Sequence, residues 1–131
     1  MPHIALDYSA NMAERTDIGA LCDHLRQAAA ATGVFPPAGI RVRAFAASHV
    51  SIADGNPQHG YVDISLRLRA GRDLDTRKRA VEAVFEAARA FLEPAMQAHP
   101  VALSLEMRDI DPELSPKCGT IRDHMQQADP R

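Results

Sequence analysis

Apolar and polar residues alternate in four separate stretches of the chain, and this period of two is typical of half-buried strands. The stretches cover residues 3–8, about 40–50, 61–69 and 101–108. In the last two of them the polar positions would share one face of a sheet, and they are Asp63, Ser65, Arg67, Glu106 and Arg108. Such a face either meets water or lines a wet channel between subunits.

Two other stretches have the spacing of amphipathic helices. The first follows Asn11 and Glu14, which are spaced like a capping box, and ends before Gly33, a natural stop. Its apolar positions at helical period are Ile18, Leu21, Cys22, Leu25, Ala28 and Ala29. The second helix is predicted from about 74 to 97, where Pro94 is expected to kink it or end it early.

The order of elements is therefore strand, helix, strand, loop, strand, helix, strand, with a repeat of about 60 residues. Each β-α-β crossover makes its two strands parallel. This predicts an α+β fold in which two β-α-β units form a four-stranded sheet with two helices on one face. We expect a single domain over 1–131, with units at about 2–50 and 60–110. The C-terminal arm, 111–131, would be a loose tail or dock on a neighbouring subunit.

Charge and composition narrow the function. The chain of 131 residues has a formal net charge of −2, which argues against nucleic acid or an anionic membrane as a partner. No apolar run approaches the roughly 18 residues of a membrane span. The N-terminus has no basic stretch before an apolar core, so a cytoplasmic location is expected. Cys22 and Cys118 lack metal-type or redox-type spacing and are interpreted as free thiols.

Most residues that could act in catalysis or metal binding are better explained by structural or solvent-exposed roles. The histidines at 3, 24, 49, 59, 99 and 124 are scattered without ligand spacing, so no metal site is expected. Asp7 and Glu106 are single carboxylates in strands, which are usually structural or solvated. A local basic run is interpreted as a solvated face; its members are Arg67, Arg69, Arg77, Lys78 and Arg79.

Pro2 is the exception because of its position. A small residue after the initiator favours removal of Met1, which leaves a free secondary amine at the start of a strand. A free α-amino group has a reference pKa of about 7.7–8.0. Burial and nearby arginines would lower that pKa, so the amine could act as a neutral base at working pH.

Several short segments then occur in a specific order: Pro2-His3 opening a strand, ATGVFP at 31–36, AGIR at 38–41, ADG at 53–55, AGR at 70–72 followed by Arg77, and LSLE at 103–106. In order and spacing they resemble the tautomerase superfamily, and within it the 5-carboxymethyl-2-hydroxymuconate isomerase family, over roughly residues 2–110. The first unit has Pro2 and Arg41, while the second has Gly71-Arg72, as expected if a duplicated unit divided its functional residues.

The resemblance implies a homotrimer that converts 5-carboxymethyl-2-hydroxymuconate, a carboxylate-rich dienol, to its oxo isomer in homoprotocatechuate degradation. It implies Pro2 as general base and acid, and no metal or organic cofactor. Arg41 and Arg72 would bind substrate carboxylates, with Arg43 as a rival for Arg41. Arg72 is expected to begin the second helix, so that its side chain and the helix amides converge on one anion. The alternatives are a tautomerase acting on a different enol or aryl pyruvate, and a non-catalytic oligomeric module of the same fold.

Overall fold

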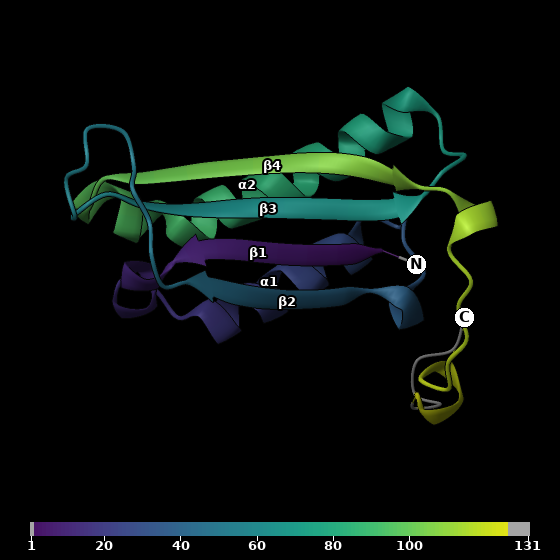
Figure 1. Ribbon diagram of the computed structural model, residues 1–131. Coiled ribbons are helices and arrows are strands. Elements are labelled where there is room, and N and C mark those ends of the chain that lie inside the picture. Colours follow the sequence, from purple (N-terminus) through teal and green to yellow (C-terminus); the bar gives the residue numbers. More distant parts are fainter. Residues whose placement is uncertain (1, 126–131) are drawn as a thin grey trace.

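Four strands form one sheet, and two helices cover one of its faces (Figure 1). The computed structural model describes residues 2–125. The sheet order is β2-β1-β3-β4, and the predicted α+β class is confirmed. The strands are β1 His3–Ser9, β2 Arg41–Ala47, β3 Gly60–Arg69 and β4 Val101–Ile110; the helices are α1 Ile18–Ala31 and α2 Leu74–Ala98.

The pairing of the strands brings distant parts of the chain to one end of the sheet. β1 is parallel to β2 and β3 is parallel to β4, as the crossovers predict. The central pair, β1 and β3, is antiparallel, with His3 opposite Arg67. The beginnings of β1 and β2 therefore lie beside the ends of β3 and β4.

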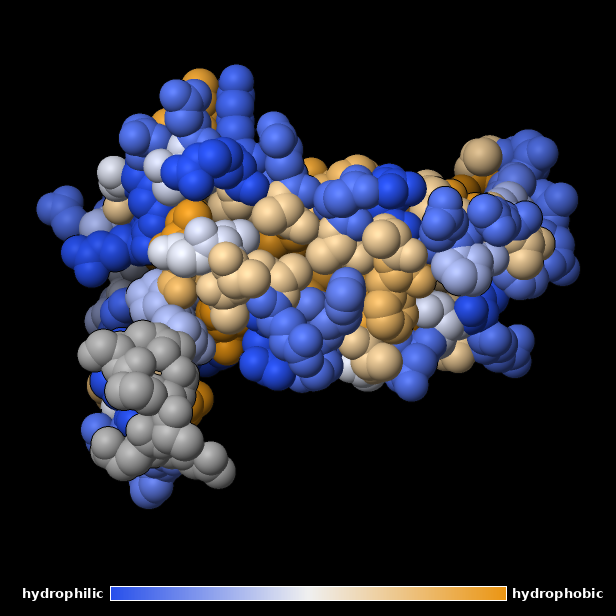
Figure 2. All heavy atoms as spheres, turned by 180° about the vertical axis from the view of Figure 1, so that it is seen from behind, coloured by the Kyte–Doolittle hydropathy of each residue, from blue (hydrophilic) through white to orange (hydrophobic). Residues whose placement is uncertain are grey.

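The core lies between the sheet and the helices. Alternate residues of the two central strands are fully buried there, including Ile4, Leu6, Ile64 and Leu66. The helices contribute residues at helical spacing: Leu21, Leu25 and Ala29 from α1, and Ala80, Val84, Ala88, Leu92 and Ala95 from α2. Figure 2 shows the helix side, where apolar residues form a band between hydrophilic ones. Because the side-chain period of a strand is two, a slip of one residue would turn this buried set to the opposite face.

The predicted capping box at Asn11 is wrong. Residues Ala10–Glu14 form a 3-10 helix, and α1 begins only at Ile18, where the Asp17 carboxylate accepts a hydrogen bond from the Ala20 amide at 3.0 Å. Asn11 instead ties two segments together, because its Nδ2 donates to the His59 carbonyl at 2.9 Å. This contact joins residues that are far apart in the sequence, so the local spacing of Asn11 and Glu14 could not reveal it.

Two other boundaries also differ from expectation. β2 ends at Ala47 rather than near 50, since a bend begins at Ser48. Pro94 does not end α2, which continues to Ala98. A proline removes one helical hydrogen bond, but Leu92 and Ala95 on either side of it are buried against the core. That burial stabilises the last turns.

The arm after β4 crosses the end of the sheet where the chain begins (Figure 1). It contains short 3-10 turns at Pro112–Leu114 and Arg122–His124, and nearly all of its residues up to 125 are exposed. The rest of the predicted arm, 126–131, and Met1 lie outside the described residues. Neither helix of the described part is long and apolar enough to cross a membrane.

Candidate active site

Pro2 lies at the shared end of the sheet, immediately before β1. Its side chain is fully buried, and its carbonyl accepts a hydrogen bond from the Arg41 amide at 3.2 Å. This bond continues the parallel ladder of β1 and β2, in which His3 is the partner of Arg41. The structure thus brings Arg41 next to the strand that begins with Pro2, as the crossover predicts.

His3 is surrounded by arginines on the open face of the sheet. Its register partners are Arg41 on β2 and Arg67 on β3, and its Nδ1 is 3.2 Å from Nη1 of Arg43. A guanidinium can only donate, so Nδ1 accepts and the ring is held in its neutral form. Partial burial and the charges of Arg67, Arg43 and Arg41 lower the pKa of His3 below its usual 6.5.

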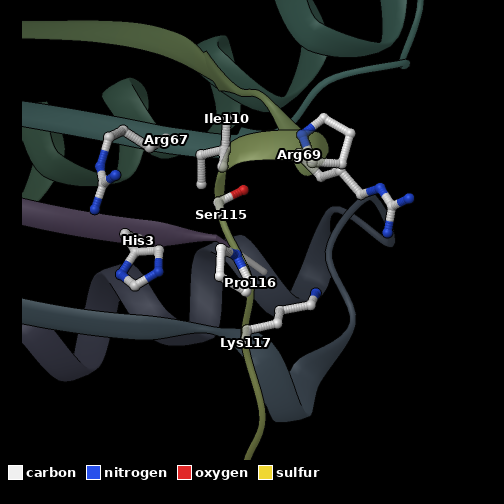
Figure 3. Close-up of a pocket in the computed structure, with 8 residues that line it drawn as sticks. His3, Arg67, Arg69, Ile110, Ser115, Pro116 and Lys117 are labelled. Carbon is white, nitrogen blue, oxygen red and sulfur yellow. The ribbon is translucent and has the colours of Figure 1, made fainter.

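A first cavity of about 320 Å³ opens beside His3, and we call it the His3 cavity. Its lining is His3, Arg67, Arg69, Ile110, Pro112, Ser115, Pro116 and Lys117. The arm therefore supplies one wall and the sheet the other. In Figure 3 the Arg67 guanidinium points toward the His3 ring, while Arg69 and Lys117 lie on the other side of Ser115 and Pro116. The lining contains three cationic side chains and no carboxylate.

A second cavity of about 330 Å³, the Arg41 cavity, lies between the segment before β2 and the later part of the arm. It is lined by Pro36, Ala38, Gly39, Arg41, Lys117, Cys118, Gly119, Ile121 and Arg122. Lys117 borders both cavities, and this lining also lacks a carboxylate. The two cavities together form an anion-attracting region around the start of β1.

Arg72 lies near this region but borders neither cavity. Its Nη1 donates to the Arg69 carbonyl and its Nη2 to the Val34 carbonyl, both at 3.1 Å. The expectation that Arg72 begins α2 is wrong, because Asp73 precedes the helix as its cap. The Asp73 carboxylate accepts from the Thr76 amide at 2.8 Å, and so takes a place at the helix amides that an anion was expected to occupy.

Four residues that the sequence pattern did not predict for the site line the His3 cavity: His3, Arg67, Arg69 and Lys117. The basic run interpreted as solvated divides in the structure, because Arg67 and Arg69 border the His3 cavity while Arg79 is exposed on α2. The antiparallel pairing of β1 with β3 sets this placement. Arg67 and Arg69 are two residues apart at the end of a strand, which puts both on one face, and this was the available signal.

Across residues 2–125, no group of three or more histidine, cysteine, aspartate or glutamate side chains is arranged to hold a metal ion. The ionisable groups that do converge are cationic. Such a set can bind carboxylates, stabilise negative charge on an enolate oxygen, and favour the neutral form of a nearby amine.

Comparison with known proteins gives a consistent result. The family model for 5-carboxymethyl-2-hydroxymuconate isomerase matches residues 2–125. A 5-carboxymethyl-2-hydroxymuconate Delta-isomerase from Escherichia coli is 35% identical over 121 residues, covering 92% of this chain and 96% of the relative.

Solved structures agree with this match. A crystal structure of 5-carboxymethyl-2-hydroxymuconate delta-isomerase has a TM-score of 0.90 at 32% identity, covering 97% of this chain and 94% of that chain. A 5-carboxymethyl-2-hydroxymuconate isomerase from Deinococcus radiodurans R1 has a TM-score of 0.87 at 26% identity, covering 96% and 95%. A fused 4-OT described as a symmetric trimer shares the fold alone, with a TM-score of 0.65 at 19% identity over 85% of this chain and 88% of that chain. With the family model spanning nearly its whole length, this chain belongs to the 5-carboxymethyl-2-hydroxymuconate isomerase family and is an isomerase of the tautomerase fold.

Proposed function

We propose that the protein is a cofactor-independent tautomerase that converts 5-carboxymethyl-2-hydroxymuconate to its oxo isomer in homoprotocatechuate degradation, with Pro2 as general base and acid. The observation that carries the proposal is the position of Pro2. It immediately precedes β1, whose neighbouring strands carry Arg41 and Arg67, and residues next to it line two cation-lined cavities. A substrate with three carboxylates matches that charge.

The proposed reaction moves one proton. After loss of Met1, the neutral secondary amine of Pro2 takes the proton of the 2-hydroxyl group. The electron pair of the broken O–H bond forms the carbonyl, and the conjugated double bonds shift along the chain. The carbon at the end of the shift then takes the proton from the Pro2 ammonium, which restores the neutral amine.

The arginines bind the substrate and stabilise the charge that develops on its oxygen. We assign Arg41 to the carboxylate beside the enol, because the hydrogen bond from its amide to the Pro2 carbonyl makes the two residues neighbours. Arg43, bonded to His3, is the rival for this role. Arg72 completes the proposed set. Its guanidinium has five N–H donors, of which two are used on the Val34 and Arg69 carbonyls, leaving three for a carboxylate of its own or an adjacent subunit.

The enzyme is proposed to be a homotrimer. The open face of the sheet carries polar residues together with Phe45, whose side chain is 59% exposed. β2 and β4 are edge strands with unpaired backbone groups, which an assembly would cover. Light scattering should give three times the mass of 14.3 kDa at micromolar concentration. A monomer at that concentration would contradict this assembly.

The test of the function combines intact mass with an ultraviolet absorbance assay on purified 5-carboxymethyl-2-hydroxymuconate and on other enols, including an aryl pyruvate. We expect protein without Met1 to be active and Pro2→Ala to keep its fold but lose most activity. A sample with one extra residue before Pro2 should be at least as impaired. Full activity in a chain that retains Met1 would refute the proline mechanism. A folded wild type without Met1 that turns over no enol would identify a non-catalytic module.

A further inference from the structure

We infer that Arg69 and Lys117 form a second carboxylate-binding subsite, which selects substrates with a carboxylate at the end remote from the enol. This inference rests on the proposed function and assigns specificity to residues outside the proposed catalytic set. The C-terminal arm then takes part in substrate selection, since it carries Lys117.

The first evidence is the charge of the His3 cavity. Arg67, Arg69 and Lys117 line it, and within residues 2–125 none of these three has a carboxylate within 4.0 Å of its side-chain nitrogens. Three other surface arginines, Arg26, Arg89 and Arg108, do have such partners. Three gathered cations without an internal counter-charge repel one another, and a bound polyanion would relieve that repulsion.

The second evidence is the position of the two residues relative to Pro2. Arg69 follows Arg67 by two positions on β3, on the same face, and is paired with Ile110 beyond the beginning of β1. Lys117 reaches the cavity from the arm, and in Figure 3 it lies with Arg69 on the side of Pro116 away from His3. Arg69 and Lys117 therefore lie on the opposite side of the start of β1 from the Arg67 guanidinium, and the distal end of a bound dienol is inferred to extend toward them.

The third evidence is the local structure of the arm. The Asp111 carboxylate accepts a hydrogen bond from the Glu113 amide at 2.9 Å, and the Ser115 hydroxyl donates to the Asp111 carbonyl. These bonds form a turn just before Pro116 and Lys117. The turn fixes the direction in which the arm leaves β4 and holds Lys117 over the sheet end. The cavity, at about 320 Å³, is within the range of small-molecule sites.

The test compares two substrates that share the reactive end. One is 5-carboxymethyl-2-hydroxymuconate, with two carboxylates remote from the enol, and the other is 2-hydroxypenta-2,4-dienoate, with none. Lys117→Gln and Arg69→Gln should each raise KM for the tricarboxylate at least fivefold while kcat changes less than twofold. With the monocarboxylate, kcat/KM should change less than twofold. Lys117→Arg should recover most of the loss. Lys78→Gln and Arg79→Gln, on exposed positions of α2, are the matched controls and should behave as wild type.

An equal loss on both substrates, or no loss on the tricarboxylate, would overturn the subsite. Calorimetric titration with propane-1,2,3-tricarboxylate and with propionate gives a readout that does not need turnover. The wild type should bind the tricarboxylate at least tenfold more tightly than propionate, and Lys117→Gln should lose most of that difference. No difference between the two ligands, or the same difference in Lys117→Gln, would refute the subsite. If wild type turns over no dienol, the proposed function fails, and this titration still decides the subsite.

Discussion

Replacing Arg41 by alanine tests the proposed site most directly, because the backbone and the side chain of Arg41 make different contacts. The substitution therefore removes the guanidinium without removing the link to Pro2. The Arg41 amide donates to the Pro2 carbonyl, and this bond survives the substitution. The guanidinium makes one internal hydrogen bond, from Nη1 to the Gly39 carbonyl at 3.3 Å. Because this bond is long, its loss should lower the free energy of unfolding by only about 1 kcal/mol.

The loss of activity should be much larger. A guanidinium that binds a carboxylate and stabilises an enolate oxygen contributes roughly 2–4 kcal/mol to the transition state. At about 1.36 kcal/mol for each factor of ten, kcat/KM on the dienol should fall about 30-fold to 900-fold. Arg41→Lys should recover only part of this, because an ammonium lacks the planar fork.

The assay is the absorbance change on 5-carboxymethyl-2-hydroxymuconate, with urea unfolding of each variant as the measure of stability. Arg79→Ala is the control, since Arg79 is exposed on α2 and should change kcat/KM less than threefold. Comparing kcat/KM of Arg43→Ala with that of Arg41→Ala shows which of the two arginines of β2 binds the carboxylate beside the enol. If Arg41→Ala and Arg79→Ala behaved alike, Arg41 would not bind the substrate, whatever the result at Pro2.

Three further results are expected. Arg72→Ala should lower the free energy of unfolding by about 1–2 kcal/mol in urea denaturation, since two carbonyls lose their donor, and should also lower kcat/KM at least tenfold; an unchanged kcat/KM would remove Arg72 from the site. His3→Gln should remove a pH dependence of the free energy of unfolding. The folded state lowers the pKa of His3, so wild type should lose stability relative to the variant as pH falls below about 6.5. Parallel urea-unfolding profiles of the two proteins from pH 7.5 to 5 would contradict this. Leu66→Ala should cost about 2–5 kcal/mol by urea denaturation, because Leu66 is fully buried in the central strand, and a smaller loss would mean that the core collapses around it.

The order of elements could be predicted from the sequence because it depends on local periodicity. Val62, Ile64, Leu66 and Leu68 alternate with polar residues, and all four are buried. Gly33 ends the first helix region with a φ of 72°, a conformation in which glycine is favoured. The parallel pairing of the two strands in each unit follows from the long connection, containing a helix, that joins them.

The contents of the site could not be predicted in the same way. His3 and Arg67 are 64 positions apart, and only the antiparallel pairing of the two central strands makes them neighbours. Lys117 follows the last strand in a segment without periodicity, so no pattern indicated which end of the sheet it would cross. Asn11 shows the same limit, since its side chain bonds to the carbonyl of residue 59 rather than capping a helix.

The antiparallel junction of the two units also explains why the proposed proline chemistry is assigned to one end of the sheet. The second unit begins at Gly60, at the opposite end, where the chain is continuous and no free amine exists. That end is closed by contacts: Gly60 donates to the Pro100 carbonyl, and a side chain at position 60 would meet Arg15 and Asn11 at 2.9 and 3.0 Å.

At the end where the chain begins, the two units contribute different things. The first supplies strand beginnings, which carry Pro2 and Arg41. The second supplies strand ends, which carry Arg67 and Arg69 and lead into the arm. Two identical units joined in this way would place a strand-beginning arginine at both ends, although only one end has the amine. A single first unit would have Pro2, Arg41 and Arg43 without Arg67, Arg69 and the arm that line the His3 cavity. The division of residues between the units is therefore what brings Pro2, the proposed base, and these cationic side chains to one end of the sheet.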